Sequence, residues 1–226
     1  MPAHRSDAEA DIRTEVVAWL RSIRPNARII HEINASDFGN RIDVMAVDLA
    51  EIISVEIKSE RDKMDRAPAQ IKAMQGCSHH VFLAAHRCHL APKVIGNPRA
   101  AMAVVEDIPV TFSAPPEAKG AVFLTWPKPA EKALCYDARP WGVLEPKQAI
   151  QSPLPSSGID ILWRDELALA CRRLGVSVPG NARMATMVAA LRWNCSGSQI
   201  TKAICRALRE RDCVEADPRV VQDDAA

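Results

Sequence analysis

The N-terminal half of the chain alternates between helix-like and strand-like hydrophobic patterns. Residues 7–23 place apolar side chains on one helical stripe and predict an amphipathic helix. Runs rich in β-branched residues then predict three strands, at residues 27–33, 42–47 and 52–57. A helix beginning at Pro68 and a buried strand over residues 81–85 follow. This order of helix, three strands, helix and strand indicates an α/β fold.

The C-terminal half has a different organisation. Residues 91–150 are rich in proline around short apolar runs, so edge strands and loops that continue the sheet are expected there. Residues 151–160 have the Ser, Pro and Gly content of a linker. Three amphipathic helices are predicted at residues 161–174, 182–193 and 199–211, before an acidic, flexible tail over residues 214–226. We therefore expect one domain over residues 1–150, with its core at about 9–90, and a small all-helical subdomain over residues 161–213.

The second and third predicted strands are expected to form a hairpin. If the chain turns at residues 49–50, Asp48 pairs with Glu51. The same register places Asp43 opposite Glu56, and directly opposed residues share a face of the sheet. The turn lacks the Asn-Gly or Asp-Gly pair that favours two-residue hairpins. A slip of one residue would move Asp43 to the other face.

Asp43, Glu56 and Lys58 form the best-supported candidate site. Side chains alternate along a strand, so Glu56 and Lys58 share one face while Val55 and Ile57 point into the core. Opposed residues have Cβ atoms roughly 4.5–5.5 Å apart, and two carboxylates at that spacing repel each other unless a positive group lies between them. A divalent cation is such a group, and Lys58 adds a second positive charge. The pattern predicts a metal-dependent site that cleaves phosphodiester bonds.

These residues carry a resemblance to a known family. The segments Arg41-Ile42-Asp43-Val44 and Val55-Glu56-Ile57-Lys58-Ser59, in this order after an N-terminal helix, resemble the PD-(D/E)xK nuclease superfamily. Residues 55–62 and the Arg66, Pro68 and Gln70 that follow are similar to a bacterial and phage branch of it, and residues 162–167 resemble the C-terminal segment of that branch. The resemblance covers residues 9–90 well and residues 160–211 loosely.

The resemblance implies a restriction-endonuclease-like core and roles for its residues. Asp43 and Glu56 would bind Mg²⁺ or Mn²⁺ together with the backbone carbonyl of Ile57. Lys58 would orient the attacking water or offset charge in the transition state. Related nucleases often carry a helical glutamate near the metal, so Glu15 is either a further ligand or a solvated residue at the edge of its helix. The secondary candidates are Gln70, Arg41 and Ser59.

One departure from the superfamily pattern concerns the second helix. Members often carry Gln-x-x-x-Tyr there, whereas Gln70 is followed by Met74. Two interpretations of Gln70 therefore remain: it contacts a residue of the site, or its side chain is merely exposed to solvent.

The basic residues of the C-terminal helices are candidates for nucleic-acid contact. Residues 161–211 contain nine Arg and Lys residues but only three Asp and Glu residues, a positive excess that favours binding to phosphate groups. Part of this region is similar to the DNA-binding modules of the SAP type. The alternative is a helical subdomain that packs on the core with a basic solvent face. The candidates for nucleic-acid binding are Arg66, Arg172, Arg173, Arg183, Arg192 and Lys202.

Cysteine and histidine residues gather around the fourth predicted strand. They are Cys77, His79, His80, His86, Cys88 and His89. No Cys-x-x-Cys pair occurs there, and the strand separates the two halves of the group by roughly 15–20 Å at about 3.3 Å per residue. We interpret these residues as strand-end and loop positions rather than as one zinc site.

Composition is consistent with a cytoplasmic protein. The 226 residues carry a net charge of +1, and no apolar run approaches the roughly 20 residues of a membrane span. The N-terminus lacks the pattern of a signal peptide, and seven irregularly spaced cysteines suit a reducing compartment. Balanced charge argues against a purely electrostatic nucleic-acid binder. Homodimerisation stays open.

The sequence therefore predicts a metal-dependent nuclease that hydrolyses DNA, in repair, recombination or the processing of phage or host DNA. No Gly-x4-Gly-Lys-Ser/Thr loop and no Gly-x-Ser-x-Gly elbow offers a competing chemistry. The alternative is a module of the same fold that binds DNA or a protein without cutting. A third interpretation makes Asp43, Glu56 and Lys58 a surface ion network of little energetic weight.

Overall fold

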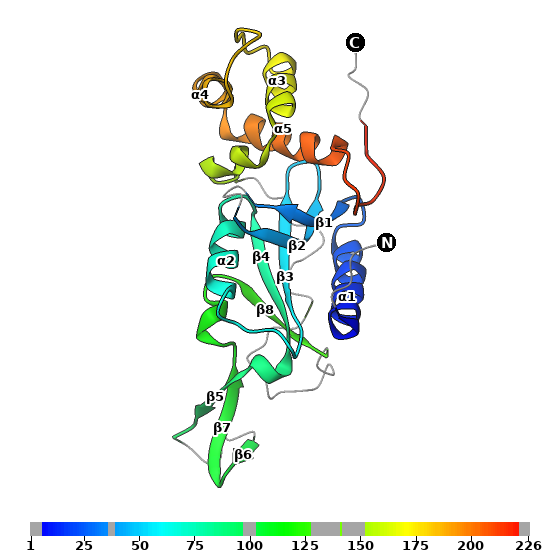
Figure 1. The fold of residues 1–226 in the computed structure, drawn as a ribbon. Helices are drawn as coiled ribbons and strands as arrows, with labels where there is room; N and C mark the ends of the chain where they lie inside the picture. Colours follow the sequence, from blue (N-terminus) through cyan, green and yellow to red (C-terminus); the bar gives the residue numbers. More distant parts are fainter. Residues whose placement is uncertain (1–5, 36–38, 97–102, 128–140, 142–151, 222–226) are drawn as a thin grey trace.

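A five-stranded mixed sheet forms the centre of the molecule (Figure 1). The computed structural model describes residues 6–35, 39–96, 103–127, 141 and 152–221. The strands run in the order β1-β2-β3-β4-β8. Their bounds are Arg28–Asn34 for β1, Arg41–Val47 for β2, Ile52–Lys58 for β3, His80–His86 for β4 and Val122–Trp126 for β8. The first three pair antiparallel and the last three pair parallel, which confirms the predicted mixed α/β architecture.

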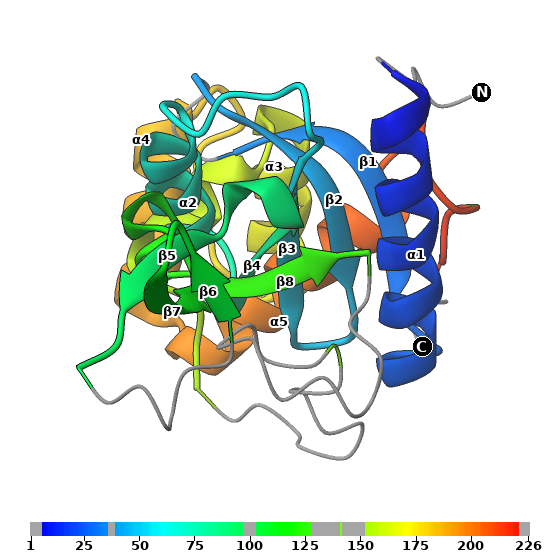
Figure 2. The same cartoon turned by 90° about the horizontal axis from the view of Figure 1, so that it is seen from below.

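Two helices cover opposite faces of this sheet (Figure 2). Helix α1 (Asp7–Ile23) begins where the Ser6 side chain accepts a hydrogen bond from the Glu9 amide, and it buries its apolar stripe against one face. Helix α2 (Ala67–Gln75) carries Pro68 in its first turn and packs on the other face. Because both faces are covered, every residue of the central strand β3 is buried.

A smaller sheet extends from one end of the central sheet. The 3-10 helix η1 (Arg87–His89) leads from β4 into it, and the 3-10 helix η3 (Pro116–Ala118) leads back toward β8. Its strands β5 (Ala91–Val94), β6 (Ala103–Val105) and β7 (Ile108–Ser113) are antiparallel in the order β5-β7-β6. Strand β8 confirms the expectation that the proline-rich region continues the main sheet, whereas residues 128–140 and 142–151 of that region lie outside the described residues.

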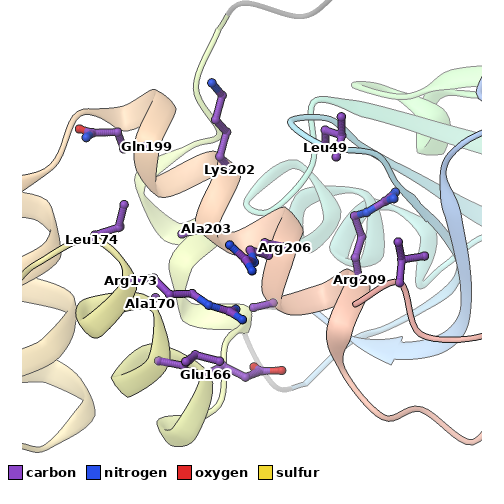
Figure 3. Close-up of a pocket in the computed structure, with 13 residues that line it drawn as sticks. Leu49, Glu166, Ala170, Arg173, Leu174, Gln199, Lys202, Ala203, Arg206 and Arg209 are labelled. Carbon is purple, nitrogen blue, oxygen red and sulfur yellow. The ribbon is translucent and has the colours of Figure 1, made fainter. Parts of the chain in front are cut away.

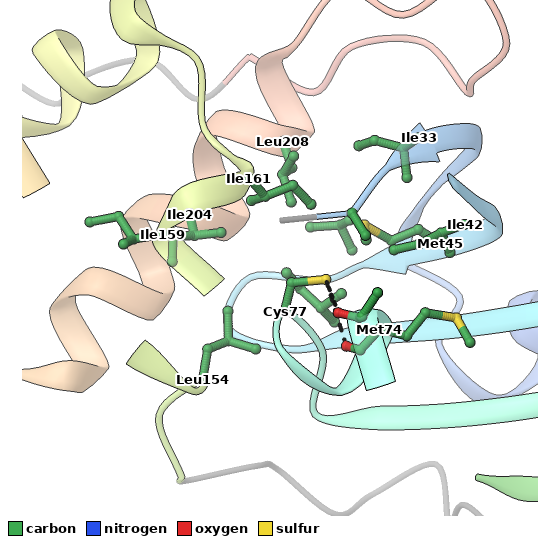
Figure 4. Close-up of a cluster of buried hydrophobic side chains, with 14 of the residues drawn as sticks. Ile33, Ile42, Met45, Met74, Cys77, Leu154, Ile159, Ile161, Ile204 and Leu208 are labelled. Atoms are coloured by element: carbon green, nitrogen blue, oxygen red, sulfur yellow. Dashed lines mark hydrogen bonds between the residues drawn. The ribbon is translucent and has the colours of Figure 1, made fainter. Parts of the chain in front are cut away.

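The C-terminal helices close the opposite end of the sheet. They are the 3-10 helix η4 (Ser156–Ile161), α3 (Arg164–Arg173), α4 (Met184–Asn194) and α5 (Gly197–Glu210). Their apolar residues and those beneath α2 form one continuous core, in which Ile159, Ile204 and Leu208 lie near Met45 and Met74 (Figure 4). No helix in the described part of the chain is long and apolar enough to cross a membrane.

The segment predicted as a linker differs from that expectation. Residues 156–160 of this segment belong to η4, which ends at Ile161, and both Ile159 and Ile161 are buried in the shared core. The Ser157 hydroxyl donates to the Gly76 carbonyl, and the Leu154 amide donates to the Thr201 hydroxyl. Proline and serine content indicated a loop, but the two isoleucines bury enough apolar surface to fix this segment on the core.

The predicted flexible tail begins later than expected. The amide of His31 donates to the Glu215 carbonyl, and the Asp217 amide donates to the Ile29 carbonyl, so residues 215–217 lie along the outer edge of β1. The buried Arg28 guanidinium donates to carbonyls at the end of α5 and to that of Asp217. This contact satisfies helix-terminal carbonyls and anchors the return of the chain. Residues 222–226 lie outside the described residues.

Candidate active site at the end of β3

The β2–β3 hairpin has the register predicted from the sequence. The Asp48 amide donates to the Glu51 carbonyl, and Val44 pairs with Val55. Beyond Val44 and Val55 the regular pairing stops. There the Asp43 carboxylate accepts a hydrogen bond of 2.8 Å from the Ile57 amide. A side chain thus replaces the missing strand contact, and this brings the carboxylate toward the end of β3.

Asp43, Glu56 and Lys58 line one polar pocket of about 280 Å³ at this end of the sheet. Residues at the N-terminus of α1 and in the loop that follows β3 also line the pocket. Its lining residues are Ser6, Glu9, Asp43, Glu56, Ile57, Lys58, Ser59, Arg61 and Asp62. The structure therefore brings together the three residues that the sequence singled out.

Burial perturbs both carboxyl groups of the pocket. Desolvation raises the pKa of Asp43 above its ordinary range, against the opposing effects of the Ile57 amide and the Arg13 guanidinium. Desolvation and the nearby Asp43 charge raise the pKa of Glu56, which is 1% exposed. Each group disfavours ionisation of the other, so the pair attracts a positive charge.

Lys58 supplies one positive charge to the site. Its Nζ donates to Glu56 Oε1 over 2.6 Å and to Gln70 Oε1 over 2.9 Å. Gln70 stands on α2, so this contact ties the helix to the central strand beside the carboxylates. Of the two interpretations of Gln70, the structure favours the contact to a site residue.

Glu56 retains one oxygen that fits a metal ligand. Its Oε2 is buried and makes no hydrogen bond within the described structure. A buried carboxylate oxygen without a partner carries a large desolvation cost. Among the described residues, no group of three or more His, Cys, Asp or Glu side chains is arranged to hold a metal. Two carboxylates and bound waters are, however, the kind of oxygen shell that Mg²⁺ accepts, and Asp43 and Glu56 provide these carboxylates.

A buried arginine that sequence reasoning missed supports the site from α1. Arg13 is 3% exposed, and its guanidinium donates to Glu9 over 2.7 Å, to Glu32 over 2.8 Å and to the Asp43 carbonyl over 2.7 Å. It therefore ties α1 to the backbone of β2 at the catalytic aspartate candidate. The Glu9–Arg13 spacing of one helical turn was the signal available in the sequence.

The predicted helical glutamate does not occupy the expected place. Glu15 is half-buried and is not among the described residues that line the pocket, whereas Glu9 from the first turn of α1 is. The start of α1 contributes Ser6 and Glu9 to the pocket, and Glu15 lies six residues beyond Glu9 along the helix. Glu9 is therefore the α1 carboxylate that lines the pocket in the described structure, and it forms an ion pair with Arg13.

The remaining secondary candidates divide between the pocket and its surroundings. Ser59 lines the pocket, and both its amide and its hydroxyl donate to Asp62. Arg41 forms an ion pair of 2.7 Å with Glu32 instead of lining the pocket. Arg66 is exposed at the start of α2, also outside the lining.

The basic candidates of the C-terminal helices do not share one environment. Arg172 and Arg183 are exposed. Arg173 forms an ion pair of 2.6 Å with Glu210, and Arg192 donates to the Ser156 carbonyl. Lys202 is exposed on α5, on the wall of a separate cavity. The predicted phosphate-binding face is therefore divided between free surface and intramolecular contacts.

The cysteine and histidine cluster has structural contacts at the ends of β4. His79 Nδ1 accepts from the Ile52 amide, and His80 lies 3.2 Å from Glu51 at the start of the strand. His86 caps η1, and the His89 ring is 2.8 Å from the Ser59 carbonyl at the other end. These positions agree with the interpretation as strand-end and loop residues.

The structure thus defines a mixed α/β protein in which Asp43, Glu56 and Lys58 line one pocket at the end of the central strand β3. The family model described as bacteriophage P4 protein cII matches residues 3–101, less than half of the chain. The matched region contains α1, the strands from β1 to β5 and every residue of the polar pocket. Comparison with curated proteins and with solved structures finds no match.

Proposed function

We propose that the protein is a metal-dependent nuclease of the PD-(D/E)xK type that hydrolyses phosphodiester bonds in DNA. The observation that carries the proposal is the half-buried Asp43 carboxyl group and the buried Glu56 carboxyl group, which line one pocket with Lys58. The order of α1, the β1–β3 meander, α2 and the parallel strand β4 supports the proposal, because the resemblance implies the same order of elements.

The residues of the pocket have separate roles in this proposal. Asp43 and Glu56 would hold Mg²⁺ or Mn²⁺, with the Ile57 carbonyl as a further ligand. A cation held there would supply Lewis-acid activation of the scissile phosphate and of the attacking water. Lys58, fixed by Glu56 and Gln70, orients that water or offsets the negative charge that develops on the phosphate. Asp43 keeps its position through the Ile57 amide and the contact of Arg13 to its own carbonyl.

DNA is the proposed substrate, and a phage or bacterial setting agrees with the matched family model. Linear, circular and single-stranded DNA are each incubated with purified protein in Mg²⁺, in Mn²⁺ and in EDTA. We expect cleavage with either metal and none in EDTA. Comparison of the linear and circular substrates distinguishes exonuclease from endonuclease action.

Variants of the three residues identify the source of any activity. Asp43→Ala, Glu56→Ala and Lys58→Ala should each lower the cleavage rate by roughly 10²-fold or more, while Glu60→Ala, an exposed neighbour outside the pocket, should not. DNA binding without cleavage by the wild type in every metal would favour the non-catalytic module instead. Cleavage by Glu56→Ala at the wild-type rate would refute the site.

A further inference from the structure

A tight turn follows β3 and brings a further basic residue to the polar pocket. The turn comprises residues 59–62 and begins directly after Lys58. Its members Ser59, Arg61 and Asp62 line the pocket together with the carboxylates described above. The proposed metal site uses none of these three side chains, so they are available for another role.

Several hydrogen bonds hold this turn in one conformation. The Asp62 carboxylate accepts from the Ser59 amide over 2.7 Å and from the Ser59 hydroxyl over 2.6 Å. The Asp62 amide donates to the Ser59 carbonyl over 3.2 Å, and the His89 ring lies 2.8 Å from the same carbonyl. The backbone that carries Arg61 is therefore fixed beside the pocket before any ligand binds, which lowers the entropic cost of a contact made by Arg61.

The Arg61 guanidinium has no partner within the described part of the chain. Arg61 is exposed, and no hydrogen bond or ion pair joins it to another described residue. Lys58, the other basic residue of the pocket lining, is bound to Glu56 and Gln70. Among the described lining residues, Arg61 is therefore the cation that remains available to a ligand.

The acidic residues of the pocket determine which anions it can accept. Glu9 is already paired with Arg13, and the carboxylate of the turn accepts two hydrogen bonds. Asp43 and Glu56 repel an anion unless a cation lies between them. An anionic ligand therefore needs positive charge at two places, from a cation at Asp43 and Glu56 and from the Arg61 guanidinium.

The lining of the pocket suits phosphate groups better than a nucleobase. Ile57 is the one apolar residue of the described lining, and no aromatic residue belongs to it. The volume of about 280 Å³ lies just below the range of roughly 300–1,000 Å³ that is typical of pockets for small molecules. Single-stranded bases bind mainly by stacking on aromatic side chains, which this lining does not offer. The phosphates of a strand are therefore the groups that fit here.

The larger cavity between α3 and α5 differs in how its arginines are used (Figure 3). Its volume is about 480 Å³, and Arg173, Arg206 and Arg209 line it. Arg173 and Arg206 pair with Glu210, and Arg209 is buried and donates to two backbone carbonyls. These guanidinium groups stabilise the fold, whereas Arg61 makes no such contact among the described residues.

We propose that Arg61 binds a second phosphate of the nucleic-acid strand, adjacent to the scissile phosphate that a cation at Asp43 and Glu56 would receive. The inference rests on the proposed function and names the substrate feature that the pocket selects, a nucleoside with phosphate on both sides. A guanidinium group offers a phosphate two parallel N–H donors, and this two-point contact is stronger than a single hydrogen bond. A strand end that lacks its terminal phosphate loses this contact and should bind less tightly than an internal nucleotide.

Calorimetric titration in Mn²⁺ compares three nucleotides as ligands of the full-length protein at about 0.15 M salt. The nucleotides are thymidine 3′,5′-bisphosphate, thymidine 5′-monophosphate and thymidine 3′-monophosphate. We expect the bisphosphate to bind at least roughly tenfold more tightly than either monophosphate, because one phosphate contacts the cation and the other contacts Arg61. The measurement requires no cleavage.

Three variants connect this preference to Arg61. Arg61→Gln should reduce the preference for the bisphosphate to about twofold or less, and Arg61→Lys should retain part of it because the charge remains but the forked donors are lost. Lys63→Gln removes the same charge at an exposed neighbour outside the lining and should leave the preference unchanged. All three variants should bind Mn²⁺ alone as the wild type does, because neither residue holds the metal.

Two results would overturn this inference. One is equal binding of the bisphosphate and the monophosphates by the wild type, and the other is a preference that Arg61→Gln keeps. Both are compatible with a protein that binds Mn²⁺ and cleaves DNA, so they would leave the proposed function intact. Absence of Mn²⁺ binding by the wild type would instead refute the metal site, and with it the adjacent phosphate contact.

Discussion

The two oxygens of the Glu56 carboxyl group have different surroundings, and only one of them has a hydrogen-bond donor among the described residues. Oε1 accepts from Lys58, whereas Oε2 is buried with no hydrogen bond in the described structure. Desolvation and the Asp43 charge raise the pKa of Glu56, so the metal-free protein holds this carboxylate at a cost. A divalent cation bound between the two carboxylates would compensate the lost hydration of Glu56 and offset its repulsion from Asp43.

Glu56→Gln should therefore separate stability from activity. The amide keeps an oxygen for Lys58 and removes the charge that Asp43 opposes. At neutral pH in EDTA, its free energy of unfolding should exceed that of the wild type by on the order of 1 kcal/mol, while cleavage is lost. Urea denaturation and a cleavage assay on the same preparations measure the two effects. Glu60→Gln, at an exposed neighbour, is the control, and a variant less stable than the wild type would contradict the argument.

Arg13 should increase the metal affinity of the site although it does not line the pocket. Replacement by Met removes its contacts to the Asp43 carbonyl and to two glutamates, so Asp43 loses part of its support. We expect Mn²⁺ affinity to fall roughly 10–100-fold, the usual effect of residues that orient ligands. Calorimetric titration with Mn²⁺ measures this without any substrate.

The conservative variant of Arg13 distinguishes positioning from general destabilisation. Arg13→Lys keeps the charge and can reach one or two of the three acceptors, so it should recover part of the affinity. If Arg13→Met remains folded at the titration temperature and binds Mn²⁺ as the wild type does, Arg13 serves only to attach α1.

Sequence pattern could reveal the three central residues but not their support. Strand alternation and hairpin register place Asp43, Glu56 and Lys58 together, and both follow from a period of two. Arg13 donates to Glu32, which has a φ of 54° and lies where the alternation of buried and exposed residues in β1 is interrupted. A positive φ at a non-glycine residue is a property of the tertiary structure that no hydrophobic pattern records.

At the scale of elements, the β2–β3 turn explains why the register was predictable despite its unusual residues. The Asp48 side chain accepts a hydrogen bond of 2.7 Å from the Leu49 amide, and its backbone amide donates to Glu51. The turn is thus closed by the backbone bond between Asp48 and Glu51 and fixed by the Asp48 side chain, without a glycine. The strands on either side are buried, so a slip in register would expose apolar residues.

Composition was less informative for the C-terminal elements. Residues 156–161 follow a segment rich in proline and serine, yet they form a 3-10 helix in the core. Residues 215–217 belong to a polar tail, yet they pair with the edge of β1. Both contacts join segments more than 70 residues apart in sequence, as the bond from Ser157 to Gly76 illustrates. Local patterns cannot predict such pairings.

Helix α5 should contribute strongly to the stability of the sheet that it covers. Leu208 is fully buried in the shared core, so Leu208→Ala should lower the free energy of unfolding by about 2–5 kcal/mol. Leu49→Ala removes the same atoms at a 57% exposed position and should change it by less than about 0.5 kcal/mol. Urea denaturation should show one transition for both variants. A second transition would mean that the C-terminal helices form a separate folding unit.

At the scale of the whole molecule, stability should depend on pH through the two raised carboxyl pKa values. A folded-state pKa above the unfolded value means that the unfolded chain releases the proton more readily. Metal-free stability should therefore fall as pH rises above about 4, the ordinary range of carboxyl groups. Thermal denaturation in EDTA across a pH series tests this. The double variant Asp43→Asn/Glu56→Gln should lack this fall in stability with rising pH.

Mg²⁺ should reverse this pH dependence because it binds the ionised carboxylates. The stabilisation on adding Mg²⁺ should grow with pH and reach about 2.7 kcal/mol when its concentration is a hundredfold above the dissociation constant. The same double variant should show none of this gain. Equal stabilisation of wild type and variant would place the cation elsewhere.

The final prediction concerns which end of the molecule contacts DNA. Arg61 lines the polar pocket and Arg172 is exposed on α3, at opposite ends of the sheet. If DNA lies along the molecule, neutralising either residue to Gln should lower the slope of log affinity against log salt by roughly 0.9. Arg61→Gln and Arg172→Gln should each weaken binding of a long duplex. Unchanged binding of the long duplex by Arg172→Gln and by Arg183→Gln would show that the C-terminal helices do not hold DNA. Their basic residues would then serve intramolecular contacts such as the ion pairs of Arg173 and Arg206 with Glu210.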